Sequence, residues 1–149
     1  MQPTVKSHMT GSPIALEADA SALSALDLMI DHGIRHLPVI DADRRVLGVV
    51  GFNDLRAAFP IPISLAAPPA SDERPELREL VVGEVMSEAP FTIHASQTVE
   101  EAAQIMVDRR VSCVPVVDDE GRIDGILTET DLLQALLTAL WAERHQESR

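Results

Sequence analysis

The sequence contains one segment twice. Residues 5–55 and 82–132 align with each other without a gap. Identical residues recur at matched positions, and the clearest pairs are Met9 and Met86, Pro13 and Pro90, Met29 and Met106, Pro38 and Pro115, Gly48 and Gly125, and Asp54 and Asp131. Such a repeat indicates one small supersecondary unit that is folded twice and packed on itself. A cleft between two similar halves is a natural place for a small ligand.

Each copy predicts the order strand, helix, strand, strand, helix. In the first copy Asp19 or Ser21 can cap the first helix, and Gly33 ends it. In the second copy residues 98–101, Thr-Val-Glu-Glu, form a capping box. The second helix of each copy is expected to begin near Asp54 and near Asp131.

A short apolar run follows the first helix of each copy, at residues 36–40 and 113–117. Runs of this length with β-branched residues predict strands that are buried on both faces. Pro38 and Pro115 should then lie at a strand start or edge, because proline has no N–H for the ladder. Hairpin turns at 41–44 and 118–121 lead into the next strands.

These patterns divide the chain into four parts. Residues 1–59 and 82–141 are the two repeats, and the last helix is expected to continue through Trp141. The proline density of residues 60–81 predicts an extended connector without a third element. Residues 142–149 are expected to fray, from about position 143.

Composition limits the class of protein. A chain of 149 residues can form one core or two small ones, and its net charge of −12 argues against a nucleic-acid surface. No stretch approaches the roughly 18 to 20 apolar residues needed to span a bilayer, and no signal-peptide pattern begins the chain. The single cysteine, Cys113, excludes an internal disulfide. We therefore expect a cytoplasmic protein without a membrane or nucleic-acid partner.

Three signatures, each present twice, resemble the CBS domain, which is named after cystathionine β-synthase and whose tandem copies form a Bateman module. The signatures are Met-Thr at 9–10 and Met-Ser at 86–87, Leu-Pro-Val-Ile-Asp at 37–41 and Val-Pro-Val-Val-Asp at 114–118, and the segments 48–55 and 125–132. The resemblance implies an α+β fold of the α/β-type CBS pair, with two β-α-β-β-α repeats packed with pseudo-two-fold symmetry.

The same resemblance implies a function. Such modules bind adenosine-containing ligands such as AMP, ADP, ATP or S-adenosylmethionine between their repeats, although some bind nothing. They commonly form homodimers and regulate an attached or partner protein. An adenosine nucleotide is thus expected as a regulatory ligand, with no cofactor required.

The strongest candidate site is the segment 125–131, where Thr128, Thr130 and Asp131 begin a helix. One interpretation is structural: Thr-x-x-Asp at a helix start is a capping arrangement that satisfies free backbone N–H groups. The other is functional, since a helix N-terminus favours phosphate. In the family, the aspartate at this position accepts hydrogen bonds from the ribose hydroxyls. The two interpretations are compatible.

The first repeat keeps the aspartate, Asp54, but has Gly51 where the second has Thr128. This departure predicts two unequal sites, and Asn53 could cap the helix instead. Arg35 and His36 precede the Pro38 strand, where some family members place phosphate-binding residues. The alternatives are a solvated arginine and a packed histidine. A net charge of −2 over residues 5–59, against −8 over residues 82–136, also favours an anion at the first repeat.

A further set of residues corresponds to family strands that line the adenine slot. These are Ile14, Ala15, Phe91 and Thr92, with Val39 and Val116 as apolar walls. Ordinary core packing is an equal alternative for each, and for Phe91 it is favoured over a stacking role.

Other types of site are not supported. His32 and His36 are four residues apart, but Gly33 interrupts the helix that would pair them on a metal. No nucleophile elbow, P-loop or dinucleotide fingerprint is present, so we expect no enzyme activity. Two hypotheses follow: a nucleotide-sensing module, and a ligand-free dimerisation or protein-interaction scaffold that uses Met29, Met106 and residues 136–141.

Overall fold

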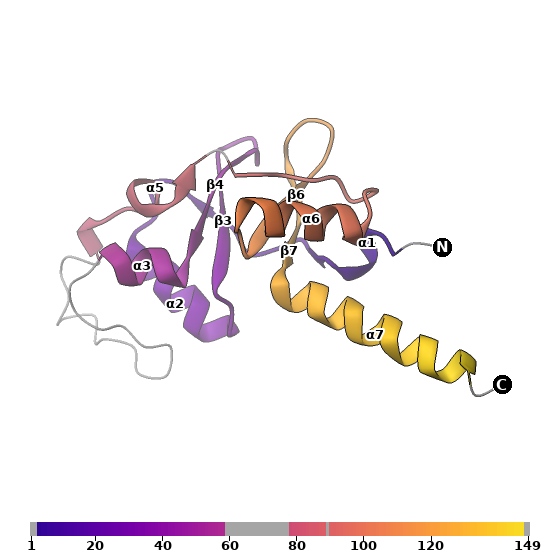
Figure 1. The fold of residues 1–149 in the computed structure, drawn as a ribbon. Coiled ribbons are helices and arrows are strands. Elements are labelled where there is room, and N and C mark those ends of the chain that lie inside the picture. The colour runs from indigo at the N-terminus through magenta and orange to yellow at the C-terminus, as the bar shows by residue number, and fades with distance from the viewer. Residues whose placement is uncertain (1–2, 59–77, 89, 148–149) are drawn as a thin grey trace. The chain divides into compact units, whose positions relative to one another are not determined.

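A computed structural model describes residues 3–58, 78–88 and 90–147. The chain divides into two compact units (Figure 1). Unit 1 comprises Met1–Ser12, Phe91–Glu120 and Asp124–Arg149, and unit 2 comprises Pro13–Pro90 and Gly121–Ile123. Each unit therefore contains the main part of one repeat together with the opening segment of the other.

Unit 2 is built on a four-stranded sheet with the order β2-β3-β4-β5. Its strands are β2 (Leu16–Glu17), β3 (His36–Ile40), β4 (Val46–Gly51) and β5 (Ser87–Glu88). Strand β3 pairs in parallel with β2 and antiparallel with β4, and β5 pairs antiparallel with β4. The helices are α2 (Ala22–His32), α3 (Phe52–Ala58) and α5 (Val82–Val85).

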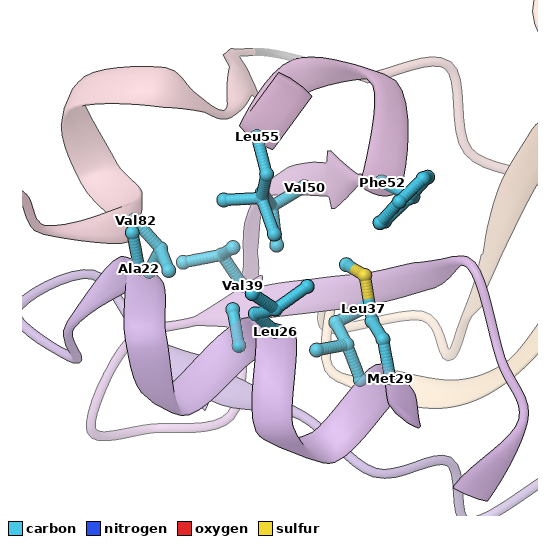
Figure 2. Close-up of a cluster of buried hydrophobic side chains, with 10 residues drawn as sticks. Ala22, Leu26, Met29, Leu37, Val39, Val50, Phe52, Leu55 and Val82 are labelled. Carbon is cyan, nitrogen blue, oxygen red and sulfur yellow. The ribbon is translucent and has the colours of Figure 1, made fainter. Parts of the chain in front are cut away.

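The core of unit 2 lies between these helices and the sheet. Figure 2 shows side chains of α2 and α3 converging on those of β3 and β4. The fully buried members include Leu26, Met29, Leu37, Val39, Val50, Leu55 and Val82. Val82 belongs to the second repeat, so the opening segment of that repeat completes the core around the first.

Unit 1 repeats this plan with a three-stranded sheet of order β1-β7-β6. Its elements are α1 (Val5–His8), β1 (Thr10–Gly11), α6 (Val99–Arg109), β6 (Cys113–Val117), β7 (Ile123–Thr128) and α7 (Glu129–Glu147). The buried core consists of Val5, Ile93, Ala102, Met106, Val114, Val116 and Leu127. Val5 comes from the first repeat, as the equivalent of Val82.

Local signals in the sequence explain where the helices begin and end. The Ser21 hydroxyl accepts a hydrogen bond from the Ser24 N–H at the start of α2, and Gly33 ends that helix with φ of 63°. Thr98 and Glu101 form the complete capping box at the start of α6. Both predictions are confirmed. Asp41 accepts from the N–H groups of Asp43 and Arg45 in the predicted hairpin turn.

Several expectations differ from the structure. Pro38 is the middle residue of β3, not its start, in a strand with neighbours on both sides. The strand tolerates it because β2 reaches only Val39 and Ile40, so position 38 has no ladder partner on that side. Pro115 is likewise the middle residue of β6, which pairs with β7 on one side and with Ile93, through Val116, on the other.

Helix boundaries also differ. The helices α3 and α7 begin at Phe52 and Glu129, two residues before the predicted positions. Helix α7 continues to Glu147, past the point where we expected fraying. Of the predicted connector 60–81, residues 60–77 lie outside the described residues, and Arg78 and Glu79 are helical rather than extended.

Candidate functional site

The start of α7 in unit 1 holds the Thr128–Asp131 pair. The Asp131 Oδ2 atom accepts from the Thr128 N–H at 2.8 Å and from the Thr128 hydroxyl at 3.1 Å. The Asp131 N–H lies 3.5 Å from the Thr128 hydroxyl oxygen, at the limit of a hydrogen bond. This is the capping geometry that the structural interpretation predicts, in which each residue satisfies a backbone donor of the other.

The start of α3 in unit 2 has the same plan with one side chain fewer. The Asp54 Oδ2 atom accepts from the Gly51 N–H at 2.7 Å. Asn53 is the second residue of α3 and is exposed, so it does not occupy the N-cap position suggested for it. Thr130, its equivalent in α7, is also exposed.

Both carboxylates keep one oxygen outside the cap. Among the described residues, the hydrogen bonds that the carboxylates of Asp54 and Asp131 accept all use Oδ2. Both side chains are partly exposed. Capping therefore fixes each carboxylate in place through one oxygen, and a polar ligand can be recognised through Oδ1.

At each helix start, the first N–H group of the helix donates to the carbonyl of the residue that precedes a strand. The Arg35 carbonyl accepts from the N–H of Phe52 at 2.8 Å, and the Ser112 carbonyl accepts from the N–H of Glu129 at 3.0 Å. Arg35 is exposed, and its neighbour His36 pairs with Gly51 in the β3–β4 ladder. In unit 2 the residue bonded to the first turn of α3 is thus a positively charged arginine. In unit 1 the equivalent residue, bonded to α7, is an uncharged serine.

Gly51 leaves room for a side chain. A Cβ atom built there would lie 3.4 Å from Asp54 Oδ2, 3.5 Å from His36 Cδ2 and 3.7 Å from the Arg35 carbonyl oxygen. These are ordinary van der Waals separations. The local backbone therefore does not require glycine at position 51, and the first repeat lacks the hydroxyl for no steric reason.

The residues proposed to line an adenine slot fall into two groups. Val39 and Val116 have no exposed surface, since they pack in the cores of unit 2 and unit 1. Ile14 is partly buried against the core of unit 2, and Ala15 is partly exposed. Core packing is thus the observed role of the two valines.

Phe91 and Thr92 of unit 1 are exposed, and Phe91 keeps 43% of its surface open. The expectation that Phe91 packs in the core is wrong. The Arg109 guanidinium carbon lies 4.6 Å from the centre of its ring, in a cation–π contact. The sequence alone does not indicate a role for Arg109, because no local pattern links the last turn of α6 to Phe91, 18 residues earlier in the chain.

Cys113 lies beside this helix start but is not a reactive group. Burial, followed by the negative charge of Asp131, raises the pKa of its thiol from 9.0 to about 12. A thiol with this pKa stays protonated at neutral pH and behaves as a small apolar side chain.

The candidate residues separate by unit. Unit 2 holds Ile14, Ala15, Arg35, His36, Val39, Asn53 and Asp54, and unit 1 holds Phe91, Thr92, Val116, Thr128, Thr130 and Asp131. Each unit thus contains one of the two helix starts and its own set of candidate residues. Within the part of the chain that the structure describes, no three His, Cys, Asp or Glu side chains gather as a metal site. No described helix combines the length and apolarity that a membrane span requires.

Comparison with known proteins agrees with this architecture. The family model described as "CBS domain" matches twice, at residues 5–61 and 82–138. A CBS domain-containing protein of Dictyostelium discoideum is 34% identical over 141 residues, which cover 94% of this chain and 95% of that protein. Enzymes among the relatives match over only 22% to 24% of their own length.

Solved structures of similar fold include complexes with adenosine compounds. CBSX2 of Arabidopsis thaliana in complex with AMP has a TM-score of 0.73 and 29% identity, covering 92% of this chain and 98% of that one. The CBS domain pair of protein MJ0100 in complex with 5′-methylthioadenosine and S-adenosyl-L-methionine has a TM-score of 0.71 and 26% identity, covering 89% and 98%. The chain belongs to the CBS-domain family and contains two CBS domains in tandem.

Proposed function

We propose that this protein is a regulatory module, without enzyme activity, that binds an adenosine-containing nucleotide at its helix starts. The observation that supports the proposal most is the pair of fixed carboxylates, Asp54 and Asp131, each held by a cap through Oδ2, with no hydrogen bond to Oδ1 from the described residues. A rigid acceptor of this kind suits the vicinal hydroxyls of a ribose. Similar CBS pairs are known in complex with AMP and with S-adenosyl-L-methionine.

The site in unit 1 is proposed to hold the ribose on Asp131 and a phosphate against the first turn of α7. The Thr128 hydroxyl and the positive end of the dipole of a 19-residue helix favour an anion there. Thr130 lies on the same turn and is exposed. Phe91 and Thr92, also exposed, are proposed to contact the base.

The site in unit 2 is proposed to use Asp54 in the same way, with Asn53 beside it. It has no hydroxyl at Gly51, but Arg35 offers the planar donor group that suits phosphate oxygens. His36, Ile14 and Ala15 complete the set. The two sites are therefore expected to differ in affinity and in the phosphate groups that they prefer.

Signalling is proposed to occur in a cytoplasmic homodimer that a protein partner reads. A nucleotide can shift the arrangement of the protein only if it binds one arrangement more tightly than another. The ligand would thus act as an allosteric regulator and not as a cofactor.

Isothermal titration with AMP, ATP, S-adenosylmethionine and cyclic dinucleotides tests the proposal. We suggest Asp131→Asn with Asp54→Asn, because asparagine keeps an oxygen for the cap but replaces the second oxygen with an NH₂ donor. Loss of a charged hydrogen bond at each site should weaken binding by roughly tenfold or more. Asp124→Asn removes the same charge from an exposed position of β7 and serves as the matched control.

Saturable binding that survives the double substitution would exclude the assigned site. If no nucleotide binds the wild-type protein at all, the scaffold hypothesis replaces the sensing one.

The asymmetry of the two sites can be tested by giving each site the residue that the other has at the position of Gly51 and Thr128. Gly51→Thr should strengthen binding in unit 2, because the new Cβ has room beside Asp54. Thr128→Gly should weaken binding in unit 1 by removing both the hydroxyl and part of the cap. Titration of each variant with the same nucleotide measures the two effects, and equal affinities in all three proteins would contradict the assigned role of Thr128.

A further inference from the structure

An arginine and an aromatic ring lie in contact on the surface of unit 1. The Arg109 guanidinium carbon is 4.6 Å from the centre of the Phe91 ring. With the arginine in this position, Phe91 still keeps 43% of its surface exposed. The contact therefore fixes the ring against a cation and leaves a large part of it open to solvent.

This contact lies at the end of the unit 1 sheet where β6 begins. Ile93 bridges Val116 of β6 in parallel, so Phe91, two residues earlier in the chain, lies toward the start of β6. Helix α6 ends at Arg109, shortly before β6 begins at Cys113. Two segments that are distant in sequence thus bring the ring and the cation to the same end of the sheet.

The capped carboxylate of Asp131 belongs to this end as well. The Glu129 N–H donates to the Ser112 carbonyl at 3.0 Å, so the first turn of α7 meets the residue that precedes β6. Strand β6 lies between β7 and the segment that contains Phe91, which places that segment two strand spacings, roughly 10 Å, from β7. A nucleoside whose ribose is held on Asp131 can extend its base across the start of β6 toward Phe91.

Unit 2 has neither group at the equivalent positions. The offset between the repeats pairs Phe91 with Ile14 and Arg109 with His32. Ile14 is partly buried against the core of unit 2, and His32 is the exposed last residue of α2. The stacked ring and cation therefore distinguish unit 1 from unit 2.

We propose that Arg109 is a positioning residue for base recognition in unit 1. Its guanidinium holds the Phe91 ring in place, and the exposed part of the ring stacks on the base of a nucleotide whose ribose binds Asp131. The inference rests on the proposed function and adds a source of selectivity to it. Unit 1 recognises the planar base by stacking, whereas unit 2 offers only the smaller, partly buried side chain of Ile14.

Isothermal titration of the full chain with AMP, adenosine and ribose 5-phosphate tests the role of the ring. All proteins in this series carry Asp54→Asn, so that binding in unit 1 dominates the titration. Phe91→Leu should weaken the binding of AMP and of adenosine by roughly tenfold, which is typical for the loss of a stack between a base and an aromatic ring. Ribose 5-phosphate has no base, so its affinity should not change.

Variants of Arg109 test whether it acts through the ring. Arg109→Gln should weaken AMP and adenosine equally, by roughly two- to fivefold. Phe91→Leu with Arg109→Gln should bind no more weakly than Phe91→Leu alone, because the arginine has no ring left to position. Arg109→Lys keeps a cation beside the ring and should restore most of the affinity. Arg56→Gln removes an exposed arginine from the last turn of α3 and is the matched control.

The results separate failure of this inference from failure of the proposed function. A loss confined to AMP would show that Arg109 binds phosphate directly, and additive losses in the double variant would show that it contacts the ligand independently of Phe91; either result would overturn the positioning role. Unchanged AMP affinity in the Phe91→Leu variant, with its fold verified by circular dichroism, would overturn the stacking role and leave the proposed function intact. If no nucleotide binds the wild-type protein, the proposed function fails and this inference fails with it.

Discussion

Gly48 and Gly125 are the glycines with the least room for a side chain, and replacing them should be costly. A Cβ atom on Gly48 would lie 2.5 Å from the Ser87 carbonyl oxygen and 2.7 Å from the Met86 sulfur. On Gly125 it would lie 2.5 Å from the Met9 sulfur and 2.9 Å from the Thr10 carbonyl oxygen. In both cases the crowding atoms belong to the opening segment of the other repeat.

The two substitutions should destabilise the protein by different amounts. A methionine side chain can move away from a new methyl group, but a backbone carbonyl in a strand pair cannot move without loss of ladder bonds. Gly48→Ala meets backbone at the shorter distance, so we expect it to destabilise by about 2–3 kcal/mol, and Gly125→Ala by about 1–2 kcal/mol. Each kcal/mol corresponds to roughly 2–4 °C in Tm for a chain of this length.

Thermal and urea unfolding followed by far-UV circular dichroism measures these effects. Gly11→Ala is the matched control, since Gly11 pairs with Gly125 in the β1–β7 ladder but a Cβ there would meet nothing within 4 Å. We expect this control to change the stability by less than about 1 kcal/mol, in either direction. Gly48→Ala and Gly125→Ala variants as stable as the control would refute the close packing of the opening segments.

Two smaller predictions concern local groups. Thr98→Ala removes the hydroxyl that accepts from the Glu101 N–H in the capping box, and should lower the unfolding free energy by about 1 kcal/mol in urea titration. Cys113 should not react with a thiol reagent at pH 8 in the folded protein but should react in urea, because burial raises its pKa to about 12. The thiol ionises at a lower pH in the unfolded chain than in the folded protein. Cys113 therefore leaves the unfolding free energy unchanged below about pH 8 and lowers it as pH rises from 9.0 toward 12. The Cys113→Ala variant should not show this loss of stability. Rapid labelling in native buffer would contradict the burial of Cys113.

Much of the fold could be predicted because its signals are local. Ser21, Gly33, Thr98 and Glu101 act within a few residues of themselves, and each does in the structure what its position suggested. The repeat predicted that both copies would share one plan. It could not predict that Val5 packs in the core around the second repeat and Val82 in the core around the first, because such an exchange leaves the pattern of apolar residues unchanged.

The candidate site was predictable in type but less so in detail. The aspartates at the helix starts follow from their spacing to the preceding strand end, and the structure shows the predicted cap. The environment of Phe91 depends on Arg109, which is distant in sequence, so apolarity alone gave the wrong expectation. Pro38 was misjudged because the extent of its neighbour β2 cannot be read from the segment that contains it.

The exchange of opening segments also limits how this protein can be divided. A fragment that ends after the first repeat would take Val5 and β1 away from unit 1 and would itself lack Val82 and β5. Neither half could then complete its own hydrophobic interior. We therefore expect that the two half-chains, divided at the connector, do not fold as autonomous domains, and that mixing them restores structure that neither has alone.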